Sequence, residues 1–432
     1  MKTQEVRSRI VSTMAVCAAA AGLVIGGAAL SSGAYAQQQD ALTHYNGNSR
    51  DYWEHPPADW YMGDETAAQQ GERPYPGQPT PTPHDELVNL VKENIKLPQG
   101  FHIEVLASGI DCARQMVFGS DGTLYVGCWV DHVYALKKQG NTWVPKVIIK
   151  GLNKPTGVGF YNGALYVADM DKIYKYPDIA NNLDNPKGEV VYSDFPPYTS
   201  HGWKYMVADP EAPGWFYIPV GPPCNVCMPP SGTAQYRHVN PDQGLSEVAA
   251  LGQRNSVGGD VDPRSGRLWF SENARDWMGD NIPSDKLNIL VKYGEHFGYP
   301  YCHQGDLPDP KFSMGHKCDE FVPPVLNVGP HMAPLGMKFY TGNNFPAEYK
   351  NNIFLAEHGG WNQRIHTGAR VVRIQADVDG QHVTSEPFAC CWIKDNKYWG
   401  RPDDIVISPM DGSLFVSDDQ AGAIYRIWYQ AQ

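Results

Sequence analysis

Residues 115–136 read QMVFGSDGTLYVGCWVDHVYAL, and the fold of the chain can be predicted from this stretch. Apolar residues alternate with polar or small ones on both sides of an Asp-Gly pair, and another alternating run follows. Asp-Gly favours a tight hairpin turn, and a period of two places every second side chain on the same face of a strand. The stretch is therefore predicted to form a small antiparallel sheet.

The same pattern recurs along the chain. Three further copies are clear and two are looser: TGVGFYNGALYVADMDKIYKY (156–176), GGDVDPRSGRLWFSENA (258–274), DIVISPMDGSLFVSDDQAGAIYRI (404–427), WKYMVADPEAPGWFYIPVG (203–221) and LGMKFYTGNNFPAEYKNNIFLAEHGG (335–360) with RVVRIQ (370–375). A single sheet of this size cannot bury both faces, so the copies must stack. We predict an all-β chain in which residues 97–432 form a six-bladed β-propeller of four-stranded antiparallel blades. A β-sandwich of unrelated hairpins is less consistent with six copies of one pattern.

The overall composition agrees with this class and disfavours some partners. The 432 residues include 24 Tyr, 43 Gly and 35 Pro, a mixture that suits short strands and tight turns better than long helices. The formal net charge is −12, and no run of Lys or Arg interrupts it. Nucleic acid is therefore not expected as a partner.

The first 36 residues have the layout of a secretory signal. Net positive charge in MKTQEVRSR precedes the apolar run IVSTMAVCAAAAGLVIGGAAL, and Ala34-Tyr35-Ala36 ends it with small residues at the positions that a signal peptidase reads. Cleavage before Gln37 is predicted, and the alternative is an uncleaved membrane anchor. No later segment is long and apolar enough to cross a membrane, so a periplasmic or secreted protein without a transmembrane domain is expected after signal removal. Residues 37–96, centred on PYPGQPTPTPH, are predicted to form a polar, Pro-rich, extended arm.

The mature chain retains eight cysteines: Cys112, Cys128, Cys224, Cys227, Cys302, Cys318, Cys390 and Cys391. An even number in an oxidising compartment indicates disulfides, and proximity in the sequence favours local pairs. Cys224-Asn-Val-Cys227 is either a structural disulfide, which we favour, or a redox or metal pair. Met228 stands where a covalent haem site needs His. Cys390 and Cys391 either form a vicinal ring or pair elsewhere.

Propellers bind ligands where the loops between blades converge, so polar residues just outside the strands are candidates for function. His201 precedes one blade, and a lone His is more often structural than catalytic. Arg254 and Asn255 precede another blade and suit an anionic ligand rich in carbonyl groups. Residues 271–276, SENARD, offer the oxygen ligands that Ca²⁺ prefers, or form a solvated acidic loop. Arg401 precedes the last blade, and Trp361 either stacks on a flat ligand or caps a blade.

Taken together, these groups resemble the glucose/sorbosone dehydrogenase family, soluble six-bladed quinoproteins that use pyrroloquinoline quinone (PQQ). GQRN (252–255), ENARD (272–276) with LN (287–288), HGGWN (358–362) and GRPD (400–403) occur in the family's order. The resemblance covers residues 97–427 and is greatest to the sorbosone-dehydrogenase branch. It implies oxidation of a sugar, sugar aldehyde or polyol by hydride transfer to PQQ.

The resemblance also implies roles for individual residues. His201 matches the general base, and a neutral imidazole suits that role. Ca²⁺ in the family acts as a Lewis acid on the quinone, and its protein ligands match the segment Ala274, Arg275 and Asp276. The cofactor-binding residues expected by resemblance are Arg254, Asn255, Arg401, Trp361, Arg364 and Gln115.

Two departures from the family pattern are visible. Ala274 stands where the family usually has Gly, so a positive φ would be less comfortable there. Arg364 is the nearest cation to the position of a Lys that contacts the quinone in soluble glucose dehydrogenases. With no haem motif in the chain, electrons are expected to pass to an external quinone or cytochrome.

Two other functions are compatible with a six-bladed fold. One is a Ca²⁺-dependent lactonase or esterase, in which carboxylate and Asn ligands from several blades converge on a metal at the axis. The other is a binding propeller without chemistry. The Arg-rich mouth argues against the lactonase.

Overall fold

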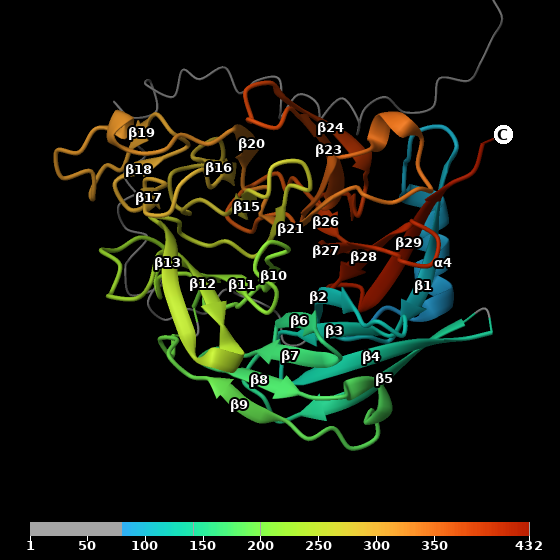
Figure 1. Cartoon of the computed structure of the whole chain (residues 1–432). Coiled ribbons are helices and arrows are strands. Elements are labelled where there is room, and N and C mark those ends of the chain that lie inside the picture. The colour runs from blue at the N-terminus through green and yellow to red at the C-terminus, as the bar shows by residue number, and fades with distance from the viewer. Residues whose placement is uncertain (1–79, 141, 199, 432) are drawn as a thin grey trace, which may run out of the picture.

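The computed structural model describes residues 80–140, 142–198 and 200–431. Six small, mainly antiparallel sheets follow one another around a central axis, as Figure 1 shows. This arrangement confirms the predicted six-bladed β-propeller. Each of the six repeated sequence stretches lies in a different blade.

The strands of the six blades have the following bounds. The first blade contains β2 (Ala113–Phe118), β3 (Leu124–Cys128), β4 (His132–Gln139) and β5 (Thr142–Lys150). The second contains β6 (Gly157–Tyr161), β7 (Ala164–Ala168), β8 (Ile173–Tyr176) and β9 (Glu189–Tyr192). The third contains β10 (Val207–Ala208), β11 (Phe216–Val220), β12 (Gln235–Asn240), β13 (Leu245–Leu251) and the short parallel strand β17 (Glu295–His296).

The remaining blades complete the ring. The fourth contains β14 (Gly259–Val261), β15 (Leu268–Glu272), β16 (Ser284–Ile289) and β20 (Leu326–Pro330). The fifth contains β21 (Pro334–Phe339), β22 (Ile353–Glu357), β23 (Arg370–Ala376) and β24 (Val383–Ala389). The sixth contains β27 (Pro402–Ile407), β28 (Leu414–Asp418), β29 (Ala423–Tyr429) and β1 (Phe101–Ser108). Two small hairpins, β18 (Cys302–His303) with β19 (Leu307–Pro308) and β25 (Ile393–Lys394) with β26 (Lys397–Tyr398), lie in loops.

The second strand of each blade is buried along its whole length. These strands carry sequences such as LYVGC in β3 and LFVSD in β28, in which residues pointing to either face pack against a neighbouring blade. Outer strands such as β13 and β24 are largely exposed. Burial on both faces of the inner strands is the expected result of radial stacking.

The ring is closed by strands from the two ends of the propeller sequence. β1 pairs antiparallel with β29, from Phe101 opposite Tyr429 to Ser108 opposite Ala423. In Figure 1 the blue β1 lies beside the red β29. The sixth blade therefore forms only when segments more than 300 residues apart in the sequence meet.

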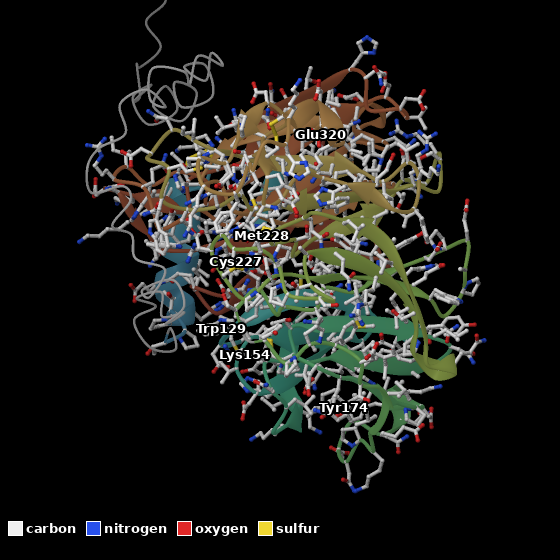
Figure 2. All side chains as sticks on the ribbon, turned by 90° about the vertical axis from the view of Figure 1, so that its left-hand side faces the viewer. Trp129, Lys154, Tyr174, Cys227, Met228 and Glu320 are labelled. Atoms are coloured by element: carbon white, nitrogen blue, oxygen red, sulfur yellow. A yellow bond between two sulfur atoms is a disulfide. The ribbon has the colours of Figure 1, made fainter. Side chains whose placement is uncertain are left out.

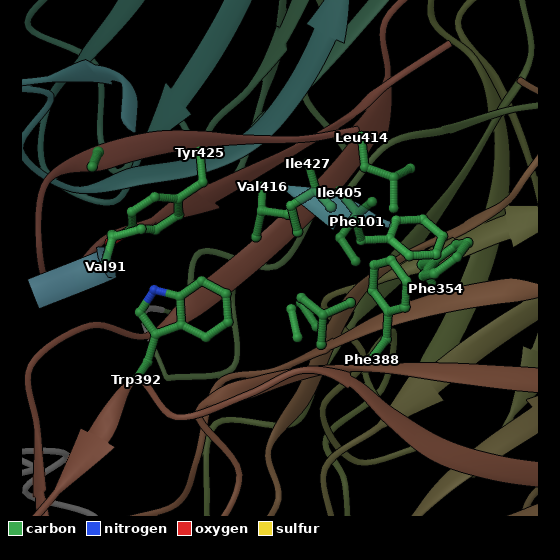
Figure 3. Close-up of a cluster of buried hydrophobic side chains, with 14 of the residues drawn as sticks. Val91, Phe101, Phe354, Phe388, Trp392, Ile405, Leu414, Val416, Tyr425 and Ile427 are labelled. Carbon is green, nitrogen blue, oxygen red and sulfur yellow. The ribbon is translucent and has the colours of Figure 1, made fainter. Parts of the chain in front are cut away.

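Aromatic side chains pack around this closure, as Figure 3 shows. Phe101 of β1 makes edge-to-face contacts with Phe345 and Phe388, whose ring centroids lie 4.8 and 4.9 Å away. Trp392 and Tyr425 are fully buried in the same cluster. The cluster joins the fifth and sixth blades.

The structured part begins earlier than predicted. Residues 84–94 lie in the predicted extended arm, but they form helix α4 (His84–Asn94). Leu87 and Val91, four residues apart and on one face, are buried in the core beside β1. The predicted signal sequence and residues 37–79 of the arm lie outside the described residues. No helix of the described residues is long and apolar enough to span a membrane.

The described residues form four disulfides, and all of them are local, as predicted. They join Cys112 to Cys128, Cys224 to Cys227, Cys302 to Cys318 and Cys390 to Cys391. Cys224-Asn-Val-Cys227 is thus a disulfide in this structure, and the adjacent Cys390 and Cys391 form the vicinal pair.

We predict that Phe101→Ala destabilises the protein by about 3–5 kcal/mol, because it removes a buried ring from the closure of the propeller. Thermal and denaturant-induced unfolding measure the change. Val190→Ala on β9 is the matched control, since this side chain is 50% exposed and its loss should change stability by no more than about 0.5 kcal/mol. Equal stability of the two variants would contradict the role of β1 in closing the ring.

Candidate functional site

A pocket lies where the loops leading into several blades converge. Its walls come from β2 and β16, from the segments before β10, β14, β16, β21 and β27, and from those after β15 and β22. The charged and aromatic lining residues are Arg114, Trp203, Arg254, Arg275, Asp276, Asp285, His331, His358, Trp361 and Arg401. The predicted Asn255 and Ala274 also line this pocket.

Arg254 is buried in the wall of the pocket and is held mainly by carbonyl groups. Its Nε donates to the backbone oxygen of Asn225 at 2.6 Å, and one Nη2 hydrogen goes to the side-chain oxygen of the same residue at 2.7 Å. Nη1 donates to Ala274 O at 2.7 Å and to Asn273 O at 3.2 Å. The carboxylate of Asp276 lies farther away, at 3.4 Å. These carbonyl groups orient the cation without neutralising its charge.

Arg401 is held in a similar way, by backbone carbonyl groups. Its Nε donates to His358 O at 3.0 Å, and its Nη2 donates to Gly359 O. The backbone N–H of Arg401 donates to Asp418 Oδ1 at 2.9 Å, which fixes the start of β27. The guanidinium lies 5.0 Å from the ring centroid of Tyr398. Backbone carbonyls again orient this cation.

Arg114 differs because carboxylates hold it. Its Nη1 lies 2.6 Å from Asp403 Oδ2, and its Nη2 lies 2.9 Å from Asp419 Oδ2. Asp419 Oδ1 lies 2.7 Å from His358 Nε2. Burial, with Arg401 and Arg114 nearby, lowers the pKa of His358 to about 3. His358 is therefore neutral at pH 7, donates its Nε2–H to Asp419 and carries its lone pair on Nδ1.

The charge of the pocket is opposite in sign to that of the chain. The lining includes four guanidinium groups and only two carboxylates, Asp276 and Asp285, in a protein of net charge −12. Arg114 and Arg275 are balanced by nearby carboxylates, and Arg275 Nη1 lies 2.6 Å from Asp309 Oδ2. Arg254 and Arg401 are the cations that carbonyls hold. The pocket is therefore suited to an anionic ligand.

The loop after β15 brings oxygen atoms to the pocket. Ala274 N donates to Asp285 Oδ1 at 2.7 Å, and burial raises the pKa of Asp285 to about 7. The expected strain at Ala274 is not found, because the left-handed residue of this loop is Trp277, with a φ of 64°. Arg275 directs its guanidinium to Asp309. Asp276 lines the pocket with its carboxylate, and Ala274 supplies a carbonyl.

His201 is buried beside the pocket wall but is not among the described residues that line it. Its Nδ1 lies 2.9 Å from Pro222 O, a contact in which the ring must donate. The tautomer with the lone pair on Nε2 follows. His201 also packs against Gly221, whose other close neighbour is the backbone oxygen of Arg254. The predicted residues His201 and Arg254 thus both contact the loop that contains Gly221.

The other predicted residues are placed at different distances from the pocket. Trp361 lines it, is 38% exposed and lies edge-on to Trp277. The side chain of Arg364 is 85% exposed and pairs with Asp280 at 2.6 Å, outside the pocket lining. The side chain of Gln115 bonds to the backbone of Met206 and Val158 and faces a separate cavity of about 670 Å³. The structure does not bring Arg364 and Gln115 together with the rest.

Sequence reasoning missed Arg114, Asn225 and the His358–Asp419 pair. Arg114 is adjacent to the predicted Gln115, and His358 lies three residues before the predicted Trp361. Their neighbours were chosen by resemblance, and the alternation of strand β2 does not reveal which of two adjacent side chains reaches the mouth. Asn225 stands between two cysteines, and nothing in the sequence indicates that it contacts Arg254. An Asp-Asp pair at the end of a strand, as in residues 418–419, is the signal that could have identified Asp419.

Comparison with known proteins gives one family and several relatives. The sequence model described as TrAA12-like matches residues 95–430. A protein of Borreliella burgdorferi (strain ATCC 35210 / DSM 4680 / CIP 102532 / B31), described as uncharacterized, is 32% identical over 356 residues, which are 79% of this chain and 92% of the relative. The pyrroloquinoline quinone-dependent pyranose dehydrogenase of Coprinopsis cinerea is 28% identical over 283 residues, which are 50% of this chain and 38% of the relative. The calcium structure of a Trichoderma reesei member of carbohydrate-active enzyme family AA12 superimposes with a TM-score of 0.69 at 20% identity, covering 78% of this chain and 97% of that one.

We predict that His358 makes the folded protein sensitive to acid. Its pKa is near 3 when folded and near 6.5 when unfolded, so its contribution to stability is complete above pH 6.5 and falls by about 1.4 kcal/mol for each pH unit below that. The difference in unfolding free energy between wild type and His358→Gln should therefore shrink by that slope between pH 6.5 and 4. His382→Gln, at an exposed position, is the control and should show no such trend. A constant difference for His358→Gln would contradict the neutral buried imidazole.

Proposed function

Because this chain belongs to the TrAA12-like family, we propose that it is an oxidoreductase that oxidises a sugar, sugar aldehyde or polyol with PQQ and Ca²⁺. The observation that carries the proposal is the pair Arg254 and Arg401, two buried cations that backbone carbonyls orient within one pocket. The sequence resemblance to the sorbosone-dehydrogenase branch favours a sugar aldehyde among these substrates.

The residues of the pocket fit an anionic quinone. PQQ carries three carboxylates. Arg401 would hold them by charge-assisted hydrogen bonds, and the positive charge of Arg254, whose N–H groups already bond to protein oxygen atoms, would attract them. Asn255 lies beside Arg254 and would donate to a quinone carbonyl. Trp361 offers a flat, partly exposed ring for stacking. When bound, the quinone would supply the carbonyl group that accepts a hydride.

The metal would use oxygen atoms of the segment 274–276. Ca²⁺ takes six to eight oxygen ligands in proteins. The Ala274 carbonyl and the Asp276 carboxylate would supply part of this set and would leave positions for the quinone and water. Arg254 near Asp276 limits the negative charge at this place, so we expect the metal to bind more tightly with the anionic quinone present.

His201 is the proposed base. Donation from Nδ1 to Pro222 O leaves the Nε2 lone pair as the proton acceptor. The base would remove the proton of a substrate hydroxyl as hydride leaves the same carbon. Burial keeps competing water from this imidazole. Electrons would then pass to an external acceptor such as a quinone or cytochrome.

We infer export to the periplasm or the exterior. The basic and apolar start of the sequence and four disulfides support this location.

The lactonase alternative needs a metal held by converging carboxylates. Among the described residues, the His358, Asp403 and Asp419 cluster comes nearest to that pattern, but Arg114 already pairs with both carboxylates.

We predict that the purified protein binds PQQ in the presence of CaCl₂ with a change in quinone absorbance. It should then reduce an artificial dye when a member of an aldose, sorbosone and polyol panel is added. Arg401→Ala should weaken quinone binding by about tenfold or more, because a hydrogen bond to a charged group contributes about 1.5–3 kcal/mol.

Arg364→Ala is the matched control for this titration, since its guanidinium lies at the surface against Asp280. It should bind PQQ as tightly as wild type. No quinone binding by the wild-type protein would overturn the proposed function. Equal loss in both Arg variants would show that the described pocket is not the cofactor site.

We predict that His201→Gln lowers the turnover number by about 10²–10⁴-fold while quinone affinity is unchanged, as expected for loss of a general base. Single-turnover reduction of bound quinone by substrate measures the step. His358→Gln is the informative comparison, because the His358–Asp419 pair also presents a neutral imidazole to the pocket. If His358→Gln loses the step and His201→Gln keeps it, the role of His201 as the base is wrong.

A further inference from the structure

Residues 221–227 form the first half of the loop that connects β11 to β12, and they contact three parts of the proposed site. The Cys224–Cys227 disulfide closes it into a small ring. Figure 2 shows Cys227 and Met228 next to each other at the face of the molecule turned to the viewer, and Met228 is 46% exposed. Asn225, two residues before Cys227, is only 8% exposed. The loop thus runs from the surface to the wall of the pocket.

Asn225 uses both its backbone and its side chain to contact the site. Its two oxygen atoms accept from Arg254 Nε and Nη2 at 2.6 and 2.7 Å. The side-chain oxygen also accepts from Asp276 N at 2.8 Å, and Nδ2 donates to Asp276 O at 3.3 Å. One asparagine therefore fixes the guanidinium proposed for the quinone and the backbone of the segment proposed for the metal.

The disulfide ring is itself anchored from behind. The hydroxyl oxygen of Tyr299 accepts from Cys227 N at 3.0 Å and lies 3.5 Å from Cys224 Sγ. Tyr299 is 1% exposed, and burial raises its pKa to about 12, so the hydroxyl stays neutral. The two ends of the ring are thus tied to one buried side chain. This leaves Asn225 little freedom to move away from Arg254.

The same loop also contacts the proposed base. Pro222 O accepts from His201 Nδ1 at 2.9 Å. A Cβ added to Gly221 would lie 2.6 Å from His201 Cβ and 2.8 Å from Arg254 O, so no larger residue fits there without a shift. The proposed base His201, the guanidinium of Arg254 and the backbone of Asp276 therefore all contact residues 221–227.

We propose that Asn225, held by the Cys224–Cys227 disulfide, is a positioning residue that couples the quinone site to the metal site. This proposal rests on the proposed function, because PQQ and Ca²⁺ are the ligands whose affinities depend on Asn225. Asn225 itself contacts neither ligand in this scheme. It acts by holding Arg254 and Asp276 at a fixed separation, so that each ligand binds better when the other is present.

The coupling between the two sites arises from the hydrogen bonds that Asn225 makes with Arg254 and Asp276. Arg254 has five N–H donors, and Asn225 accepts two of its hydrogen bonds. Without the side-chain oxygen of Asn225, a buried donor of Arg254 and the N–H of Asp276 both lose an acceptor. The guanidinium would then turn toward Asp276, whose carboxylate is already 3.4 Å away. That movement would neutralise the cation and occupy a proposed metal ligand at once.

The test is titration of purified variants with PQQ at fixed CaCl₂ and with Ca²⁺ at fixed PQQ, followed by quinone absorbance. Asn225→Ala is expected to weaken both affinities by about tenfold or more and to reduce the effect of each ligand on the other. Val226→Ala, in the same ring, is the matched control and should leave both affinities as in wild type. Thermal unfolding of the ligand-free variants is measured in parallel.

Removal of the disulfide supplies a second variant. Cys224→Ser with Cys227→Ser leaves Asn225 in place but opens the ring, and it should weaken both ligands in the same coupled manner. The control is Cys302→Ser with Cys318→Ser, which removes a disulfide from another loop. It should lower thermal stability without uncoupling the two ligands.

The outcomes separate this proposal from the function on which it rests. If wild type binds no PQQ, the proposed function fails. If wild type binds PQQ and Asn225→Ala retains both affinities and their coupling, the positioning role is overturned and the function stands. Loss of thermal stability in Asn225→Ala with unchanged coupling also overturns it, because that result is the signature of a merely structural residue.

Discussion

The pairing of β1 with β29 is the contact on which the rest of the structure depends. The first, second and fifth blades form from consecutive strands, and the third and fourth exchange order only through β17 and β20, but the sixth needs a strand from the beginning of the described domain. Until that strand joins, the sixth blade lacks its outer edge, and the aromatic cluster around Phe101 cannot form. The ring then fixes the distance between blades. The pocket depends on this, because its Arg residues come from segments in or next to the first, fourth and sixth blades.

The pocket shows how a protein can bury several guanidinium groups in one place. A buried cation is costly unless its donors find acceptors. Arg114 meets two carboxylates, whereas Arg254 and Arg401 meet mainly backbone carbonyls of loops that the ring holds in place. The first solution gives a nearly neutral support, and the second leaves positive charge directed at the pocket. The two kinds of Arg therefore have different physical roles although all of them line the same wall.

The repeats of the sequence predicted the fold because hairpin turns and alternation are local properties. Local pairing of the cysteines was predictable for the same reason, since short separations bring sulfur atoms together in almost any such sheet. Arg254 and Arg401 were predictable because their motifs match the family and they lie in segments that lead into a blade, where side chains reach the mouth. Arg364 and Gln115 were not distinguishable from them by sequence, because Asp280 and the backbone of Met206 hold them elsewhere through contacts between distant segments. The attachment of helix α4 was missed because two apolar residues on a short segment are a weak signal beside a Pro-rich run.

The net charge of the protein and the cations of the pocket act on a ligand at different distances and with opposite sign. The protein as a whole carries a charge of −12, which repels anions at distances up to the Debye length, about 8 Å at physiological ionic strength. Inside the pocket, Arg254 and Arg401 would lie close to the proposed anionic ligand, where salt screens buried charges far less. Selection of that anion would then depend on short-range interaction with these two cations and not on attraction from afar. Contact selection requires that the cations already stand in the correct places, which is why the carbonyls that orient them, including those of the small disulfide ring at Asn225, matter as much as the charges themselves.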